Sequence, residues 1–252
     1  MTGPALAARL VEARHARCTH AFQAAEEPAG SAEAYATQAQ VATGLGTGVA
    51  GWKVGFAPTP GQTPMAGPIF ACDMRENGGT YRLAAGETVK VEVELALRLR
   101  ADLPARPHAP YTPGEILAAT HAMLVGIELV GSRFTDPDSA PFTARLADNF
   151  NNAAYVAGEG ISDFAGLDRA QLRCRLWVDG ELVTDHVGGH GDGDPLVPLL
   201  AWASHQADAL GGLRAGQVIT TGSLNAPVAL SRNALIEAEL SGLGRVRLRL
   251  EA

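Results

Sequence analysis

The chain has 252 residues, of which 46% are hydrophobic and 19% charged, with a formal net charge of −7. Such a chain can bury one large core or two small ones, and its negative charge argues against nucleic acid as a main partner. No stretch has the roughly 18 uninterrupted apolar residues of a membrane span. Three cysteines, Cys18, Cys72 and Cys174, are an odd number with no close pairing. Together with a beginning that lacks the apolar segment of an export signal, they predict reduced thiols and a cytoplasmic location.

The first part of the chain is predicted to be helical. Residues 4–24 and 31–43 have helical composition, and Ser31 is placed to cap the second helix. Residues 58–68 are rich in proline and glycine and are predicted to form a loop.

Two more helices are expected further along. Residues 112–115, Thr-Pro-Gly-Glu, combine a capping box with proline at the first helical position, so a helix should run to about Met123. Asp194-Pro195 should begin another helix, which Gly211 and Gly212 should end.

Strand patterns dominate the rest of the chain. Residues 175–185 predict a hairpin turning at Asp179-Gly180, residues 216–223 a buried strand, and residues 233–251 a closing hairpin. These strands do not alternate regularly with helices, so the fold class is α+β rather than a doubly wound sheet. We expect a helical N-terminal part, residues 1–75, followed by a β-rich part, residues 76–252.

One strand carries two carboxylates on the same face. Residues 89–100, VKVEVELALRLR, alternate with period two, which places Glu92 and Glu94 side by side with Cα atoms roughly 6.7 Å apart. Like charges this close disfavour each other unless a cation lies between them. The alternatives are a solvated outer face and a metal site.

A third carboxylate lies in an apolar run. Glu128 is inside AMLVGIELVG, residues 122–131, which predicts a buried strand. An ionised carboxylate there costs several kcal/mol unless it is paired or binds a metal. Arg133 is a candidate partner for a purely structural pair. If Glu128 converges with Glu92 and Glu94, the three carboxylates form a hard-oxygen site that suits Mg²⁺ or Mn²⁺.

The chain has only two lysines, Lys53 and Lys90. Lys53 lies in GWKVGF, an apolar stretch typical of a strand, where a lysine often extends to the surface. Buried near a carboxylate such as Asp73, it could instead hold an anionic substrate or transfer a proton.

Two other motifs are given structural interpretations. GTGVAG, residues 46–51, matches a dinucleotide fingerprint, but a helix precedes it and a strand follows, which is the reverse of the required order. Residues 185–194 contain His186, His190, Asp192 and Asp194 in a glycine-rich run. Their spacing fits no metal motif and Asp194 is accounted for as a helix cap, so a loop is favoured over a metal site.

These stretches also carry a family resemblance. Their order and spacing resemble the 2-keto-4-pentenoate hydratase and 4-oxalocrotonate decarboxylase branch of the fumarylacetoacetate hydrolase superfamily. The similarity covers nearly the whole chain. The motifs that carry it are GWKVGF, GPIFACDM, VEVELAL, GIELVGSR, ADN at 147–149, residues 193–223 and the closing strands.

The resemblance implies a β-rich superfamily fold, a mixed sheet or roll, with a small helical N-terminal part and one divalent cation held by Glu92, Glu94 and Glu128. Hydratases of this branch convert 2-hydroxypenta-2,4-dienoate to 4-hydroxy-2-oxopentanoate in aromatic catabolism, with the metal chelating the substrate. Lys53 and Asp73 match the family's lysine and aspartate and are expected to transfer protons. Residues expected at the substrate, or supporting it, are Phe70, Arg133, Asp148, Asn149, Asn151, Thr221, Gly222 and Ser223. The resemblance also implies a homo-oligomer that can associate with a pathway enzyme.

Decarboxylation of 4-oxalocrotonate, a 2-oxo-3-enedioate, is the alternative. Where the hydratases carry Asp-Asn-Ala-Ser, this chain has Asp-Asn-Phe-Asn at residues 148–151, which replaces a serine hydroxyl by the amide of Asn151. The loop within residues 56–70 is also shorter, and FACDM has one residue more than the hydratases' FADM. These departures leave the exact substrate open.

Two further interpretations rank lower. Acylpyruvate hydrolases of the superfamily carry a His-x-x-Glu pair ahead of the metal strands, and residues 54–90 contain none. A non-catalytic scaffold subunit would not need three convergent glutamates for folding.

Overall fold

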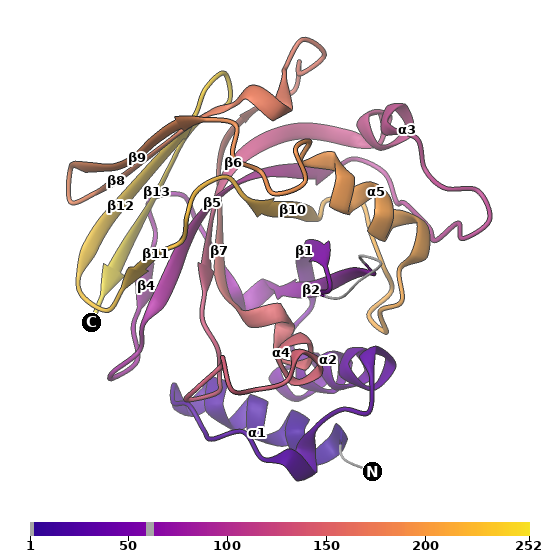
Figure 1. The fold of residues 1–252 in the computed structure, drawn as a ribbon, viewed down its shortest axis with the longest axis vertical. Coiled ribbons are helices and arrows are strands. Elements are labelled where there is room, and N and C mark those ends of the chain that lie inside the picture. Colours follow the sequence, from indigo (N-terminus) through magenta and orange to yellow (C-terminus); the bar gives the residue numbers. More distant parts are fainter. Residues whose placement is uncertain (1–2, 59–62) are drawn as a thin grey trace.

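The structure is a computed structural model that describes residues 3–58 and 63–252. Two β-sheets and a group of helices form the fold (Figure 1). The larger sheet contains β1 (Val49–Phe56), β2 (Pro64–Phe70), β3 (Met74–Arg75), β5 (Val89–Leu99), β6 (Thr120–Val130), β7 (Asn152–Ile161), β10 (Val218–Ser223) and β11 (Val228–Leu230). Its order is β2-β1-β10-β5-β6-β7-β3, and β11 also pairs with β5.

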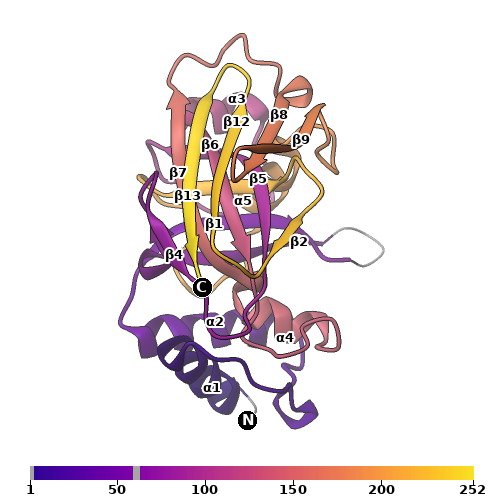
Figure 2. The ribbon, with the colours of Figure 1, turned by 90° about the vertical axis from the view of Figure 1, so that its left-hand side faces the viewer.

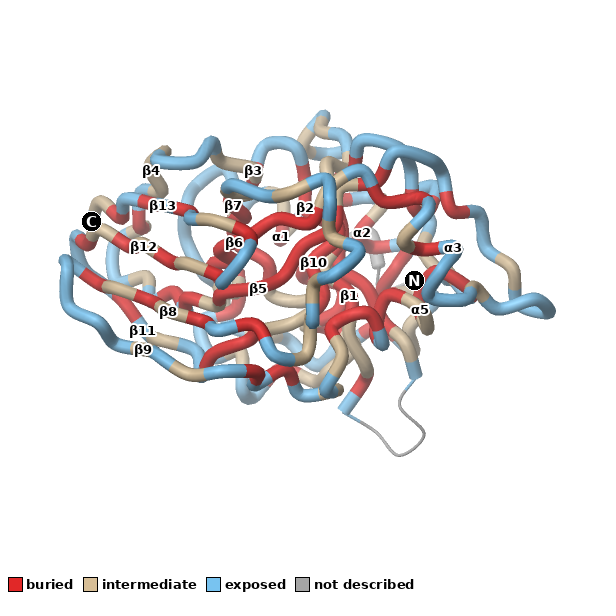
Figure 3. The backbone as a smooth tube through the Cα atoms, turned by 90° about the horizontal axis from the view of Figure 1, so that it is seen from above, coloured by how far each residue is buried: buried red, intermediate tan, exposed pale blue. Residues whose placement is uncertain are grey.

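The smaller sheet closes one side of the molecule. It contains β4 (Thr80–Arg82), β8 (Arg173–Val178), β9 (Glu181–Val187), β12 (Ala234–Leu240) and β13 (Gly244–Glu251), in the order β4-β13-β12-β8-β9. Strands β12 and β13 pack against β6 and β7, as Figure 2 shows from the side. The main core extends from the space between the two sheets to the helices, where Trp52, Trp202 and Tyr35 are buried. In Figure 3 most of β5 is buried, because it is central in the larger sheet.

Helices cover the other parts of the larger sheet. They are α1 (Gly3–Ala16), α2 (Ser31–Leu45), α3 (Pro113–Ala118), α4 (Phe142–Ala147) and α5 (Leu196–His205), with single 3₁₀ turns η1 (Ala24–Glu26), η2 (Ala71–Asp73), η3 (Asn149–Asn151) and η4 (Arg169–Gln171). Helix α1 packs on α2, α2 packs on α4, and α5 packs on β1, β2 and β10. Trp202 of α5 lies 6.3 Å from Trp52 of β1 and 5.7 Å from Tyr35 of α2, measured between ring centroids. These aromatic contacts fix β1, and with it Lys53. No described helix is long and apolar enough to cross a membrane.

The strand predictions are confirmed. The chain has an α+β fold, and the two predicted hairpins are β8–β9 and β12–β13. Asp179 and Gly180 both have positive φ, 53° and 83°, as a tight hairpin turn of two residues requires. Residues 46–51 follow a helix and enter a strand, as expected.

Three helix ends were predicted too far along the chain. The first helix ends at Ala16 rather than near residue 24, because Arg17 has a left-handed φ of 51° and His20 then forms a bridge with Phe134. The capping box of Thr112 and Glu115 is confirmed, but α3 ends at Ala118 since β6 begins at Thr120.

The last helix is capped by a residue that the sequence did not single out. Helix α5 ends at His205, and Gln206 takes the left-handed conformation with a φ of 38°. The Gln206 side chain donates to the carbonyls of Leu103 and Ala203 and accepts from the N–H of Leu213. The glycines at 211 and 212 therefore shape the following loop instead of ending the helix.

Other boundary predictions differ at the N-terminal part. Gly30, not Ser31, is the N-cap of α2. The predicted loop at 58–68 is shorter, because β2 begins at Pro64; residues 59–62 lie outside the described part of the chain. Strands β1 and β2 share a sheet with β5 and β6, so the division at residue 75 stays a prediction that does not coincide with a boundary between sheets.

Candidate metal centre

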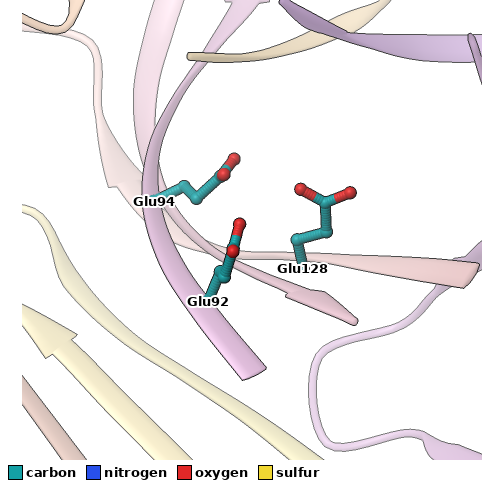
Figure 4. A group of neighbouring side chains, drawn as sticks. All are labelled: Glu92, Glu94 and Glu128. Carbon is teal, nitrogen blue, oxygen red and sulfur yellow. The ribbon is translucent and has the colours of Figure 1, made fainter. Parts of the chain in front are cut away.

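Three glutamates converge on one face of the larger sheet. Strands β5 and β6 are antiparallel, and their register places Glu92 opposite Glu128 and Glu94 opposite Gly126. The side chains point toward a common region in Figure 4. Each offers a carboxylate oxygen within 4.8 Å of the others. Glu94 and Glu128 are buried and Glu92 is half-buried, so this face is not the solvated surface that the alternation alone allowed.

The glutamates repel one another in the absence of a cation. Burial, and then the charge of Glu128, raises the pKa of Glu92 to about 7. Burial, Glu128 and Glu92 raise the pKa of Glu94 well above its ordinary value. Oε2 of Glu94 and Oε2 of Glu128 are buried and have no hydrogen-bond partner in the described part of the chain. Unsatisfied, mutually repelling carboxylate oxygens fit a divalent cation of the magnesium type.

Lys53 is the cation that faces this cluster. Its Nζ lies 2.8 Å from Oε1 of Glu128, and its side chain is only 14% exposed. Burial lowers the pKa of Lys53, but the charges of Glu128, Glu92 and Glu94 outweigh burial and raise it. The ammonium therefore stays protonated and offers its remaining N–H groups to a ligand.

The turn at the end of β10 lies against Glu94. Ser223 is opposite Glu94 in the β5–β10 register, and the Gly222 backbone N–H donates to the Glu94 carboxylate. Gly222 has a φ of 118°, and a Cβ there would lie 3.0 Å from Nε2 of His190. The Thr221 hydroxyl donates to the carbonyl of Leu95 and is buried. The structure thus brings Gly222 and Ser223 to the glutamates, whereas the hydroxyl of Thr221 is turned to the backbone.

Two residues that the sequence analysis missed lie beside the glutamates. Asn152 Nδ2 donates to Oε1 of Glu128 at 2.9 Å. Tyr155 is fully buried beside Glu94, and burial followed by that negative charge raises the pKa of its phenol well above 10.0. A Cβ at Gly126 would lie only 1.8 Å from the Tyr155 hydroxyl oxygen, so this strand position requires glycine. The repeated asparagines at 151 and 152 were the only sequence signal.

Arg133 is not the partner of Glu128. Its Nε and Nη2 donate to the side chain and carbonyl of Asp148, and its Nη1 donates to the carbonyl of Asn152 at 2.8 Å. Asp148 also accepts from Ser132. This buried pair holds the backbone that carries Asn152, so Arg133 and Asp148 position the site rather than face the glutamates.

Asp73 and Phe70 are placed away from Lys53. Asp73 Oδ2 accepts from Arg14 Nη1 at 2.7 Å, and the Arg14 guanidinium lies 5.4 Å from the Phe70 ring centroid. Phe70 is fully buried. The proton-transfer role of Asp73 and the substrate contact of Phe70 stay predictions, because the described side-chain contacts of both are with Arg14 and not with Lys53 or the glutamates.

A strained turn covers Lys53. Asn149, Phe150 and Asn151 have left-handed φ values of 54°, 55° and 60° in succession. Three such residues without glycine cost on the order of 1–2 kcal/mol each, so the surrounding structure must enforce them. The Phe150 ring centroid lies 5.1 Å from Lys53 Nζ. A Cβ at Gly67 would lie 2.4 Å from the carbonyl oxygen of Asn149, so β2 needs glycine where this turn approaches.

The side-chain amides of the two asparagines in this turn are not fully hydrogen-bonded. Asn149 Nδ2 donates to the Pro68 carbonyl, but Oδ1 of Asn149 and Oδ1 of Asn151 are buried without a partner in the described residues. Both therefore offer an acceptor for a ligand group.

The histidines of residues 185–194 bind backbone. His186 and His190 interact through Nε2 with the carbonyls of Leu224 and Thr221, at 2.6 and 2.8 Å. Asp194 pairs with Arg169 and accepts from the N–H of Leu196. This segment supports the turn after β10, and the three glutamates are the metal-ligand cluster found among the described residues.

Comparison with known proteins agrees with this arrangement. Residues 16–251 match the fumarylacetoacetate (FAA) hydrolase C-terminal family. The chain belongs to the fumarylacetoacetate hydrolase family. It is 34% identical to a 2-keto-4-pentenoate hydratase of Burkholderia vietnamiensis, over 96% of this chain and 95% of that protein.

The chain is also similar to 4-oxalocrotonate decarboxylases. The 4-oxalocrotonate decarboxylase of Pseudomonas putida is 26% identical over 82% of this chain and 76% of that one. A solved structure of 4-oxalocrotonate decarboxylase from Pseudomonas putida G7, complexed with magnesium and adipate, has a TM-score of 0.81 at 23% identity and covers 98% of this chain and 96% of its own. This likeness confirms the superfamily fold.

Proposed function

We propose that the chain is a divalent-metal-dependent lyase that adds water to a 2-hydroxy-2,4-dienoate to give a 4-hydroxy-2-oxo acid. The observation that carries the proposal is the convergence of Glu92, Glu94 and Glu128 beside Lys53. Similarity to 2-keto-4-pentenoate hydratases over nearly the whole chain supports the reaction type.

The three glutamates would hold Mg²⁺ or Mn²⁺, since carboxylate oxygens suit both. When bound, such a cation polarises the oxygens of a 2-oxo or 2-hydroxy acid as a Lewis acid and orients them. The turn of Gly222 and Ser223 lies next to Glu94, but the Gly222 N–H donates to Glu94 and the Ser223 hydroxyl donates to the carbonyl of Asn225. Both would exchange these partners for the substrate carboxylate on binding.

Lys53 is our candidate for moving a proton to or from the substrate chain. It is held by Glu128 and covered by the Phe150 ring, so it has one direction in which to present its N–H groups. Hydration of 2-hydroxypenta-2,4-dienoate adds a proton at C5 while the C2 hydroxyl loses its proton and becomes a ketone, and it adds the hydroxyl of water at C4 and the remaining proton of water at C3. The product is 4-hydroxy-2-oxopentanoate. Tyr155, which stays a neutral phenol, provides a buried hydroxyl beside Glu94 that has no hydrogen-bond partner in the described residues.

Decarboxylation of a 2-oxo-3-enedioate is the second candidate, supported by the decarboxylase relative. Its six-carbon substrate has a distal carboxylate, which a positively charged side chain would have to bind. The cations that act on Glu92 are Lys53, already paired with Glu128, and Lys90, which is exposed on β5. The apolar Phe150 ring over Lys53 is better suited to an uncharged dienoate tail, so hydration is the better-supported reaction.

An absorbance assay separates these reactions. The protein is incubated with Mg²⁺ and freshly generated 2-hydroxypenta-2,4-dienoate, in parallel with 2-oxohex-3-enedioate, and each reaction is repeated with EDTA. Metal-dependent loss of the dienoate band with 4-hydroxy-2-oxopentanoate as product supports hydration, whereas carbon dioxide from the diacid supports decarboxylation. The variant E128Q should be inactive. The variant E181Q, which changes an exposed glutamate of β9, is the control and should be fully active. If neither substrate changes, the proposed reaction is wrong.

The family resemblance further suggests a small-acid substrate, a homo-oligomer and association with a pathway enzyme. Light scattering of the purified protein measures the oligomeric state directly. A single monomeric mass would contradict the oligomer.

A further inference from the structure

A cavity lies apart from the glutamates. It has a volume of about 610 Å³, within the range of small-molecule sites, and is bordered by the C-terminal end of α1, by β3 and β4, and by Ser132 and Arg133. Neither Lys53 nor any of the three glutamates lines it. One described connection to the metal centre runs through residue 152, whose carbonyl accepts from Arg133 of the cavity wall and whose side chain donates to Glu128.

The cavity wall gathers positive charge in a chain that is negative overall. Five arginines line it: Arg14, Arg17, Arg75, Arg82 and Arg133. The carboxylates of the wall, Asp73 and Glu87, are both engaged. Asp73 pairs with Arg14, and Glu87 accepts from the Tyr81 hydroxyl and from the N–H of Ala84.

Two of these arginines have no carboxylate partner in the described residues. Arg17 donates to the carbonyl of Arg82, and Arg75 donates to the carbonyls of Cys72 and Met74. Backbone carbonyls accept hydrogen bonds but do not neutralise a guanidinium charge. Arg17 and Arg75 therefore remain available to an anion.

Arg14 is a third arginine of the wall, and one of its N–H groups lacks a hydrogen-bond acceptor. Its side chain is only 9% exposed, and its Nε is buried without a hydrogen-bond partner in the part of the chain that the structure describes. Burial and the nearby Arg133 charge lower the pKa of Arg14, and the Asp73 charge offsets this only in part. An anion in the cavity would supply the missing acceptor.

We propose that this cavity binds a small organic acid through Arg17, Arg75 and Arg14, at a site separate from the three glutamates. Guanidinium groups bind carboxylate and phosphate in the same forked geometry, so the charge alone does not separate the two. The volume and the apolar wall contributed by Ala13, Leu45 and Ala153 favour a carboxylic acid with a carbon chain over inorganic phosphate.

Calorimetric titration of the intact protein tests the site. The probes are succinate, inorganic phosphate and succinamide, which has the same chain as succinate without its charge. We expect one succinate per chain with a Kd below about 1 mM, weaker binding of phosphate and none of succinamide. Tighter binding of phosphate than of succinate would overturn the assignment to an organic acid.

Matched variants locate the binding. R17Q/R75Q should weaken succinate binding at least about tenfold, as the loss of charged hydrogen bonds requires. R214Q/R232Q changes the net charge equally at two exposed arginines outside the cavity and should bind as the wild type does. Equal binding by both double variants, or no heat from succinate up to about 10 mM, would overturn the proposal.

Two controls distinguish an anion in this cavity from an anion at the glutamates and from a contact between two copies of the chain. K53M removes the cation of the glutamate cluster and should leave succinate binding unchanged, whether or not the proposed hydratase activity is correct. If K53M abolishes the binding, the anion lies at the glutamate site and the proposal fails. If the wild type binds no succinate and R17Q/R75Q changes the molecular mass in light scattering, the cavity is covered by a second copy of the chain and the proposal also fails.

Discussion

Lys53 and Glu128 form an ion pair from strands that are not neighbours in the sheet. Strand β1 is separated from β6 by β10 and β5. Three strand spacings correspond to about 14 Å in a flat sheet, yet Lys53 Nζ lies 2.8 Å from Glu128 Oε1. The long side chains of Lys53 and Glu128 span part of this distance, and curling of the sheet toward this face shortens the rest. The site therefore depends on the curvature of the sheet as well as on the strand order.

The buried Glu94 distinguishes a metal site from a structural cluster. Without metal its charge is unfavourable, because burial and the two other glutamates raise its pKa. We therefore expect E94Q to raise the melting temperature of the metal-free protein and to abolish the gain that millimolar Mg²⁺ gives the wild type. That gain is about 2.7 kcal/mol at a Mg²⁺ concentration of 100 Kd. Calorimetric melting with EDTA and with Mg²⁺ measures both effects.

The exposed E181Q is the control for Glu94 and should keep the Mg²⁺ response. A structural role for Glu94 would give the opposite pattern, namely a destabilised metal-free E94Q protein with an unchanged response to Mg²⁺.

The capping box of α3 predicts an acid-dependent contribution to stability. Hydrogen bonds from the Thr112 N–H, from Arg106 and from the Thr112 hydroxyl lower the pKa of Glu115 from 4.5 to about 2. The folded pKa lies below the unfolded one, so this stabilisation is present above about pH 4.5 and is lost as pH falls toward 2. In E115Q the cap keeps an acceptor but loses the charge. The urea midpoints of wild type and E115Q should therefore differ at pH 7, move closer below about pH 4.5 and converge as the pH reaches about 2; a constant difference would contradict the charge contribution.

The sequence predicted those parts of the site that depend on local pattern. Period two places Glu92 and Glu94 on one face, and burial singles out Glu128, so one strand pairing brings all three together. The sequence could not predict the contacts that depend on sheet curvature or on distant segments. The partners of Lys53 and of Asp73 are set by tertiary packing, because Lys53 and Glu128 are 75 positions apart in the sequence and Arg14 and Asp73 are 59 positions apart.

The predictions of the helix ends were wrong for a similar reason. Propensity continues past Ala16 and Ala118, but the pairing of His20 with Phe134 and of β6 with β5 takes these residues into extended structure. Tertiary hydrogen bonds outweigh helix preferences of a few tenths of a kcal/mol per residue.

Phe150 should control the shape of the substrate region beside Lys53. Its ring lies 5.1 Å from the ammonium, a contact worth about 0.5–2 kcal/mol. We expect F150A to lower kcat/KM for 2-hydroxypenta-2,4-dienoate about tenfold. The kcat/KM for dienoates with longer alkyl tails, relative to that for 2-hydroxypenta-2,4-dienoate, should rise in this variant. F142A is the control, because it removes the edge contact with Phe150 at 5.8 Å but leaves the ring over Lys53. Equal loss of activity in both variants would indicate general loosening of the turn.

Asn152 should set the metal affinity through Glu128, which it contacts without being a ligand. Its Nδ2 donates to Oε1 of Glu128 at 2.9 Å, and removal of such a supporting hydrogen bond typically weakens metal binding about 10- to 100-fold. N152A should therefore need about 10- to 100-fold more Mg²⁺ for half-maximal activity, with near-normal kcat at saturating Mg²⁺. N77A is the matched control, because the Asn77 side chain also accepts one hydrogen bond, from the N–H of Arg247, and joins the turn before β4 to β13 rather than to β5 or β6. An unchanged Mg²⁺ requirement in N152A, with its fold verified by circular dichroism, would show that Lys53 and the strand register alone orient Glu128.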